Sequence, residues 1–248
     1  MSTLLLALVT TTLAAQQSSP WETLEPGLSY REVTITTSEP WATGRLHVFR
    51  VNLDTHQLVP IDARRPNRTR ATVNDLAKGA AAQLLINGTY FDERDRPLGL
   101  LMDRSRTLNP LRRADWGVFY VDKGRAHLVH TKQWRTSPVK APEFAIQVGP
   151  RCVVAGKALK LKPQVARRAA LGIQEDGSVL VVISTGELLS GDLAHAMATK
   201  ESAGGLGCVN AVMLDGGGSA QLWATTGKRR WRLPGSWPVP NAVAVRRR

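Results

Sequence analysis

Short runs of β-branched and aliphatic residues recur along most of the chain, and they constrain its fold more than any other feature. They lie at residues 33–37, 46–52, 57–61, 117–121, 126–129, 144–148, 169–173, 179–184 and 242–245. Branched side chains pack well on a pleated surface, so such runs are typical of β-strands. The Asp-Lys-Gly and Glu-Asp-Gly steps at 122–124 and 175–177 favour tight turns between paired strands. The chain is therefore predicted to be rich in sheet.

Two stretches have a helical pattern instead. The first follows Thr72, which is expected to cap the helix, and Asp75 three residues later completes a capping box. The second begins near Ser190 or Asp192, either of which is a suitable cap. No low-complexity linker interrupts the chain. Together these patterns predict an α+β fold: a single domain with a mixed, mostly antiparallel sheet and a few flanking helices.

Each predicted helix leads into a continuous apolar run, at 84–86 and at 211–214. Continuous rather than alternating apolar residues indicate strands buried on both faces, as in sheets with helical crossovers. One run stops at Asn87 and the other at Asp215, and a glycine follows each. Ligands gather beyond the carboxyl ends of such strands. We therefore expect Asn87 and Asp215 to meet in one site.

The turn that starts at Asp215 is the sharpest local signal. Gly216, Gly217 and Gly218 follow it, and Ser219 ends the turn. Three glycines lose much backbone entropy on folding, which suits a place where the backbone approaches a ligand or bends sharply. Successive N–H groups in such a turn form a nest for anions. The alternative, equally favoured by local spacing, is a tight hairpin between two strands.

A second cluster follows Asn87. Asn87 offers a donor and an acceptor in one side chain. Tyr90 and Phe91 provide rings that can stack on a sugar, and Asp92 adds a second carboxylate. Glycoside hydrolysis usually needs two carboxyl groups. The alternative is an ordinary Asn-Gly turn at the end of a strand.

Two further segments add polar side chains at the ends of predicted strands. Arg167 and Arg168 precede a strand of small residues, and the planar guanidinium suits phosphate. Taken alone, an exposed arginine pair is the simpler interpretation. Asn241 stands at the entry of the last strand, where by itself it indicates a turn.

The chain is strongly basic, with 33 Lys and Arg against 20 Asp and Glu and a net charge of +13. This excess predicts attraction to anionic partners, and an anionic cell-envelope polymer is one candidate. Basic runs at 228–232 and 246–248, with seven tryptophans, keep open a non-catalytic binder of anionic glycan or nucleic acid. No recognised nucleic-acid motif is present, so we predict no specific nucleic-acid partner.

The N-terminus has the features of a targeting segment. Residues 1–14 are mostly apolar and end in small residues, which predicts a signal peptide and an exported protein, periplasmic or secreted. No apolar run reaches about 18 residues, so we predict no transmembrane segment. Cys152 and Cys208 are either a disulfide or two buried thiols. No Cys and His cluster is present, and no metal or cofactor is predicted.

Four segments in order resemble the phosphodiester glycosidase family. They are Asn-Gly-x-Tyr-Phe-Asp at 87–92, Arg-x-Ala-Leu-Gly-Ile at 168–173, Leu-Asp-Gly-Gly-Gly-Ser at 214–219 and Val-Pro-Asn-Ala at 239–242. The resemblance covers roughly residues 45–246. Thr89 and Ala169 depart from the residues common at their positions. The main polar positions of the motifs are intact.

The resemblance implies a catalytic domain over residues 30–246. The implied reaction is hydrolysis of a sugar-1-phosphodiester, similar to N-acetylglucosamine-1-phosphodiester, to free sugar and a phosphomonoester. The implied catalytic residues are Asp215, Asn87, Arg168 and Asp92. The implied substrate and phosphate contacts are Gly216, Gly217, Gly218, Ser219, Tyr90, Phe91 and Asn241.

Overall fold

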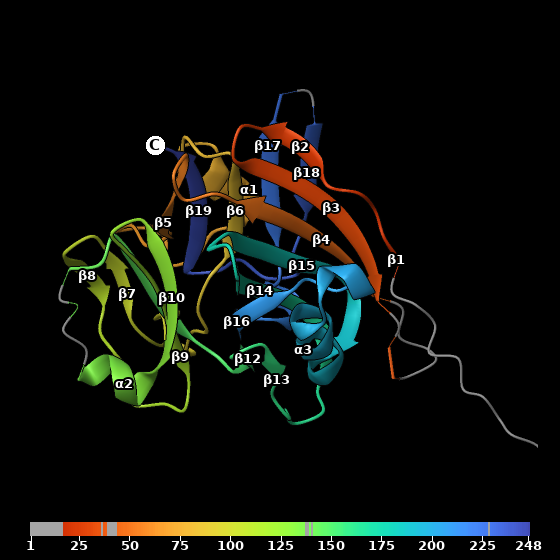
Figure 1. Ribbon diagram of the computed structural model, residues 1–248. Helices are drawn as coiled ribbons and strands as arrows, with labels where there is room; N and C mark the ends of the chain where they lie inside the picture. Colours follow the sequence, from red (N-terminus) through yellow and green to blue (C-terminus); the bar gives the residue numbers. More distant parts are fainter. Residues whose placement is uncertain (1–16, 36, 39–43, 137–138, 140, 228) are drawn as a thin grey trace, which may run out of the picture.

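Three antiparallel sheets make up most of the molecule (Figure 1). The computed structural model describes residues 17–35, 37–38, 44–136, 139, 141–227 and 229–248. The largest sheet has nine strands. In spatial order they are β1 (Gln17–Ser18), β3 (Leu28–Ile35), β4 (Gly44–Val51), β15 (Val179–Leu189), β14 (Val165–Gln174), β16 (Cys208–Met213), β12 (Arg151–Val154) and β13 (Lys157–Ala158), with β2 (Glu22–Glu25) paired to β3.

Two five-stranded sheets pack beside it. One has the order β10 (Arg125–His130), β9 (Gly117–Asp122), β11 (Phe144–Val148), β7 (Leu101–Asp103) and β8 (Arg106–Asn109). The other has the order β18 (Arg229–Leu233), β17 (Leu222–Thr226), β6 (Leu84–Asn87), β19 (Asn241–Arg247) and β5 (His56–Asp62). The short helices are α1 (Val73–Ala77), α2 (Thr131–Arg135) and α3 (Ser190–Ala198), with 3-10 turns η1 (Glu201–Ala203) and η2 (Gly217–Ser219).

The predicted α+β class with a mixed sheet is wrong. Strands make up 51% of the described residues and helices 11%, so the fold is mainly β. The prediction treated the continuous apolar runs as strands next to helical crossovers. Both runs instead pair antiparallel with their neighbours: β6 with β17 and β19, and β16 with β14 and β12.

The continuous apolar character of β6 has a different cause. Leu84 and Ile86 face the central core, whereas Leu85 packs in a second cluster with α1 behind the sheet. Both faces of β6 are thus covered although its sheet is antiparallel. A run of apolar residues reports burial on two faces, and it does not report strand direction.

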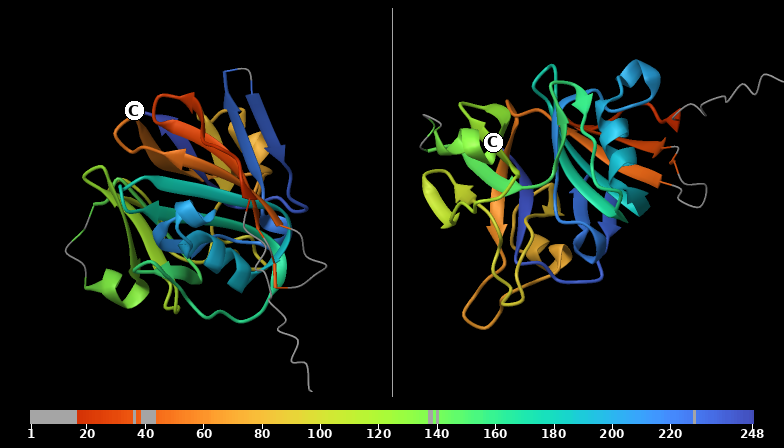
Figure 2. Two further views of the ribbon diagram at one scale, coloured as in Figure 1. Left: turned by 45° about the vertical axis from the view of Figure 1, so that its right-hand side comes forward. Right: turned by 90° about the horizontal axis from the view of Figure 1, so that it is seen from below.

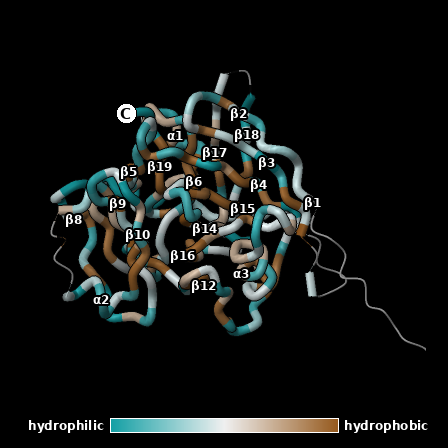
Figure 3. The backbone as a smooth tube through the Cα atoms, viewed as in Figure 1, coloured by the Kyte–Doolittle hydropathy of each residue, from teal (hydrophilic) through white to brown (hydrophobic). Residues whose placement is uncertain are grey.

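The central core lies between the three sheets. Phe49 of the large sheet, Ile86 of one small sheet and Phe119 of the other belong to the same buried cluster. Figure 2 gives two further views of the three sheets, and Figure 3 shows the apolar residues along them. Helix α3 packs on the outer face of the large sheet, where Leu193 and Met197 fill a separate cluster. This frame of paired strands holds the loops at the strand ends.

The two predicted helices exist, and they are short. Thr72 caps α1, and its hydroxyl accepts from the Asp75 N–H at 3.1 Å, as predicted. The predicted cap of the second helix is wrong, because Leu189 occupies the N-cap position of α3 and Ser190 is its first residue. Ser190 uses its hydroxyl elsewhere, on the Lys162 carbonyl at 2.6 Å.

The predicted signal peptide, residues 1–14, lies outside the described residues. Within the described part of the chain, no helix is long and apolar enough to cross a membrane. Cys152 and Cys208 are both buried and unpaired.

Candidate active site

A cavity of about 550 Å³ opens where the ends of several strands converge. It lies between the end of β16, the start of β14, the loop after β6 and the loop after β13. Its polar and charged lining consists of Tyr90, Asp115, Lys160, Lys162, Gln164, Arg168, Ser190 and Asp215. Gly216 and Gly217 complete this wall. Five of the eleven predicted site residues therefore face one cavity: Tyr90, Arg168, Asp215, Gly216 and Gly217.

Asp215 lies two residues after the end of β16 and is largely buried. Burial raises the pKa of its carboxyl from the ordinary 3.8 to about 6, although hydrogen bonds from the Ser219 side chain and the Gly216 backbone act to lower it. A buried carboxylate loses hydration, which disfavours its charged form. Asp215 thus titrates close to neutral pH in a cavity wall, as a residue that exchanges protons should.

The glycine turn packs tightly against β14. A Cβ atom at Gly216 would lie 2.8 Å from the Arg167 carbonyl and 3.9 Å from Nη1 of Arg168, so a side chain does not fit there. Gly217 has a φ of +58°, in the left-handed region that glycine adopts without strain. The three glycines are therefore explained by close approach and backbone conformation.

Arg168 enters the cavity through an irregularity in β14. The register between β14 and β15 shifts between Arg167 and Ala169, and a shift of this kind turns a side chain out of its regular alternation. The Arg168 Nε donates to the Leu188 carbonyl at 3.1 Å, and Nη2 donates to the Gln164 carbonyl. Burial lowers the pKa of its guanidinium from the ordinary value. No acidic side chain among the described residues forms an ion pair with it. Arg167 points elsewhere and donates to the Pro234 carbonyl.

Tyr90, in the loop after β6, also lines the cavity. Its hydroxyl donates to the Gly149 carbonyl, and its ring packs on Trp116 with 5.2 Å between centroids. Burial, together with the charge of Asp215, raises the pKa of Tyr90 to about 12. The phenol is therefore fixed and neutral, and it offers an aromatic face to the cavity.

Asn87 does contact Asp215, as predicted, but the Asn87 side chain does not line the cavity. The Asn87 Nδ2 donates to the Asp215 carbonyl at 2.7 Å, and its Oδ1 accepts from the Gln221 N–H at 3.1 Å. The Asp215 N–H in turn donates to the Gly88 carbonyl at 3.1 Å. Asn87 is fully buried and holds the turn that carries Asp215 against the end of β6.

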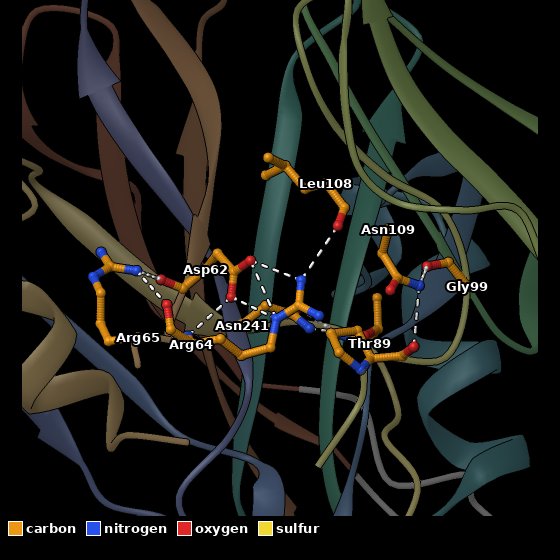
Figure 4. Close-up of polar contacts among 9 residues, drawn as sticks. Asp62, Arg64, Arg65, Thr89, Gly99, Leu108, Asn109 and Asn241 are labelled. Carbon is orange, nitrogen blue, oxygen red and sulfur yellow. Dashed lines mark hydrogen bonds and ion pairs between the residues drawn. The ribbon is translucent and has the colours of Figure 1, made fainter. Parts of the chain in front are cut away.

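Asn241 has a similar position on the next strand. It is fully buried, its Oδ1 accepts from the Thr89 N–H at 3.0 Å, and its Nδ2 donates to the Thr89 hydroxyl at 2.9 Å (Figure 4). A Cβ at Gly88 would lie 1.9 Å from the Asn241 Oδ1, so glycine is required there. Asn241 thereby fixes the loop that leads to Tyr90.

The other predicted site residues do not line the cavity. Asp92 pairs with Arg96 at 2.7 Å in its own loop, and Phe91 packs beside the cluster under α1. The Cβ direction of Gly218 faces the Trp237 ring. Ser219 is buried and acts on the pKa of Asp215 through a hydrogen bond.

The basic runs proposed above as contact patches are partly neutralised. Arg229 pairs with Glu22 and Arg247 pairs with Glu25. Arg248 pairs with Glu143 at 2.9 Å. Part of the basic excess near the C-terminus is thus compensated within the protein.

The sequence comparison with family models decides the family. The model described as phosphodiester glycosidase matches residues 80–246, more than half of the chain. The chain belongs to the phosphodiester glycosidase family. The resemblance proposed from the four motifs is confirmed, and all four lie within the matched region. This family comprises glycosidases that act on phosphodiester-linked sugars.

Several solved structures share the fold of this chain. The catalytic domain of zebrafish N-acetylglucosamine-1-phosphodiester alpha-N-acetylglucosaminidase, auto-inhibited by pro-peptide, has a TM-score of 0.70 at 15% identity, covering 95% of this chain and 89% of that one. A Burkholderia pseudomallei protein described as exported has a TM-score of 0.68 at 11% identity, covering 97% and 98%. A hypothetical Synechocystis protein has a TM-score of 0.61 at 15% identity, covering 93% of this chain, which spans 64% of that protein. At these identities the likenesses show the fold. No curated protein matches the sequence.

Sequence reasoning missed several residues that line the cavity. Lys160, Lys162 and Gln164 come from the irregular segment between β13 and β14, and Asp115 comes from the loop before β9. The sequence gives one signal for the lysines and Gln164: their segment leads directly into β14, the strand that carries Arg168. Within the described residues, no group of three or more His, Cys, Asp or Glu side chains is arranged to hold a metal ion.

Proposed function

We propose that this protein hydrolyses a sugar-1-phosphodiester to free sugar and a phosphomonoester, with Asp215 at the catalytic centre. The observation that carries the proposal is the pairing of two groups on one cavity. Asp215 has a pKa raised to about 6, and Arg168 is a buried cation with no acidic partner among the described residues. The first group suits proton transfer at neutral pH, and the second suits a phosphate.

The proposed reaction breaks the anomeric C–O bond through an oxocarbenium-like transition state. The ionised Asp215 accepts a proton from a water molecule as the water oxygen bonds to the anomeric carbon. The electron pair of the broken bond stays on the phosphate oxygen. The proton then passes to solvent or to the phosphomonoester, and Asp215 is again ionised.

Arg168 is proposed to hold the phosphate and to stabilise the charge that develops on the leaving oxygen. Two of its guanidinium nitrogens are fixed by the Leu188 and Gln164 carbonyls, so the cation is oriented before substrate binds. Preorganised charge of this kind contributes much of the rate enhancement in many enzymes. The backbone of Gly217, on the same wall, is proposed as a further contact for the phosphate oxygens.

Asn87 and Asn241 are proposed as positioning residues. Each is fully buried, with both ends of its side chain hydrogen-bonded to neighbouring residues. Asn87 holds the backbone of Asp215, and Asn241 holds the loop before Tyr90. They would act on the substrate through the residues they fix.

We propose that the catalytic domain spans residues 30–246 and that residues 1–14 direct export. The likeness of the fold to a protein described as exported supports this proposal. Expression in a secreting host, followed by N-terminal sequencing of the exported protein, tests it. A mature chain that begins at residue 15 is expected, and retention of Met1 on the exported protein would contradict it.

The test of the activity is release of reducing sugar from a panel of sugar-1-phosphodiesters. The native protein is expected to turn over at least one of them, and Asp215→Asn to lose activity at least about a hundredfold. Asp176→Asn is the matched control, because Asp176 lies in the exposed turn between β14 and β15. Full activity of Asp215→Asn, or binding of these substrates without turnover by the native protein, would refute the proposal.

A further inference from the structure

Two lysines stand on the cavity wall without an assigned role. Lys160 and Lys162 both line the cavity, and both side chains are exposed. Among the described residues, no acidic side chain pairs with either of them, whereas Lys78 pairs with Asp75 at 2.8 Å. Two unpaired positive charges are thus available to a ligand at the mouth of the site.

The segment that carries these lysines is fastened to the catalytic frame. The Ser190 hydroxyl donates to the Lys162 carbonyl at 2.6 Å, and the Ser190 N–H donates to the Gln164 carbonyl at 3.1 Å. Arg168 also donates to the Gln164 carbonyl. The segment shares its anchors with the proposed phosphate ligand, so the lysines are held in a defined relation to Arg168.

One exposed carboxylate also lines the cavity. Asp115 has a side chain that is 95% exposed, and His130 Nε2 lies 2.6 Å from its carboxylate. His130, with Arg151 and Lys132 nearby, lowers the pKa of Asp115. Asp115 precedes β9 of a small sheet, whereas the lysines follow β13 of the large sheet. In Figure 1, β9 and β13 both lie in the lower part of the molecule. Asp115 and the two lysines therefore reach the cavity from two different sheets.

The lining suits a substrate with a neutral part and an anionic part. Carboxylate oxygens and an aromatic ring suit the hydroxyls and faces of a neutral sugar, while they repel an anion. A simple phosphodiester carries one negative charge, which Arg168 alone can balance. The two lysines add positive charge that a simple phosphodiester does not balance. They therefore suit a substrate with a second negative charge on the part beyond the phosphate.

We propose that Lys160 and Lys162 form a subsite for a second phosphate on the aglycone. The substrate class is then a sugar-1-phosphodiester whose aglycone carries a further phosphate group. This inference rests on the proposed function. Lysine binds phosphate as a point charge. The subsite therefore requires a negative charge on the aglycone near the lysines, and it does not require a fixed hydrogen-bond geometry.

The test uses two substrates that share one sugar. In one, the phosphodiester joins the sugar to propanol; in the other, the propyl chain ends in a phosphate. At low salt we expect the native protein to have about a tenfold lower KM for the phosphorylated substrate, because two exposed charge pairs together contribute about that factor. Raising the ionic strength should reduce the preference. The double variant Lys160→Ala, Lys162→Ala should lose this preference.

Lys157→Ala is the matched control, because Lys157 is exposed on β13 next to the segment and does not line the cavity. It should keep the preference. Equal KM values for the two substrates in the native protein would overturn the subsite, and so would an unchanged preference in the double variant. The shared sugar is one that the native protein releases from the panel of sugar-1-phosphodiesters, and if it releases none of them, the proposed function itself fails. If it hydrolyses the neutral one without preferring the other, only the subsite fails.

Discussion

Replacing Asp215 by asparagine should stabilise the protein while it removes activity. Burial raises the pKa of Asp215 to about 6, so the folded protein at pH 7 holds an ionised carboxylate that has lost much of its hydration. Asparagine has nearly the same shape, it is neutral at every pH, and its carbonyl can still accept from Ser219. The variant therefore avoids the cost of burying the charge.

The size of this effect follows from the pKa. One pKa unit corresponds to about 1.4 kcal/mol, so a rise from 3.8 to about 6 corresponds to about 3 kcal/mol at pH 7. Between these two pH values the folded state binds the proton more tightly than the unfolded state, so stability falls as the pH rises. Asp215→Asn should exceed the native protein by about 3 kcal/mol at pH 7, and the difference should nearly vanish at pH 4.

Urea unfolding at pH 4, 5, 6 and 7 measures this difference, provided that both proteins unfold in one cooperative transition. Contributions of other titrating groups cancel between the two proteins. Asp62→Asn is a control of opposite sign. Burial raises the pKa of Asp62, but hydrogen bonds from the Arg64 side chain and backbone outweigh this and lower it overall (Figure 4). Asp62→Asn should lose stability at pH 7 and less at pH 4. An Asp215→Asn variant that is less stable than the native protein at pH 7, or a difference independent of pH, would refute the reasoning.

Three further predictions concern the same site. The kcat/KM of hydrolysis should rise as the pH increases through about 6 and level off above it, because the ionised Asp215 is the reactive form; a pH profile that falls through this range would contradict that role. Arg168→Lys should lower kcat about a hundredfold, since lysine lacks the second fixed donor; steady-state kinetics with folding checked by circular dichroism measure it, and unchanged kcat would contradict the assignment. Asn87→Ala should lower the free energy of unfolding by about 1–3 kcal/mol, because the buried Asp215 carbonyl and Gln221 N–H lose their partner. Urea unfolding measures this change, and a free energy of unfolding within roughly 0.5 kcal/mol of the native value would contradict the positioning role of Asn87.

The contact between the polar residues at two strand ends was predictable from the glycines that follow them. Glycine loses more backbone entropy on folding than other residues, so it indicates a place where the backbone needs its conformational freedom. The Asn87-Gly88 and Asp215-Gly216 steps indicated places of close approach, and the structure joins them by a hydrogen bond of 2.7 Å. The expected reason, the carboxyl ends of strands in a sheet with helical crossovers, was wrong, because β6 and β16 belong to two different antiparallel sheets. Apolar continuity reports burial, and it carries no information on strand direction.

Other features of the site depend on long-range packing that no local pattern records. Lys160 and Lys162 resemble any exposed lysines until the hydrogen bonds of Ser190 bring their segment to the cavity. Asp92 resembles a catalytic carboxylate in its motif, but Arg96 four residues later pairs with it and holds it in its own loop. The motifs alone could not distinguish the environment of Asp92 from that of Asp215, because each motif places a carboxylate near the end of a strand.

Hydrolysis in water enriched in oxygen-18 tests the central claim most directly. If the anomeric C–O bond breaks, mass spectrometry of the products from a sugar-1-phosphodiester will find the label in the free sugar and not in the phosphomonoester. Asp215→Asn should form no labelled sugar under the same conditions, while Asp176→Asn should form as much as the native protein. Label in the phosphomonoester would mean that water attacks phosphorus, and the proposed glycosidase mechanism at Asp215 would be wrong.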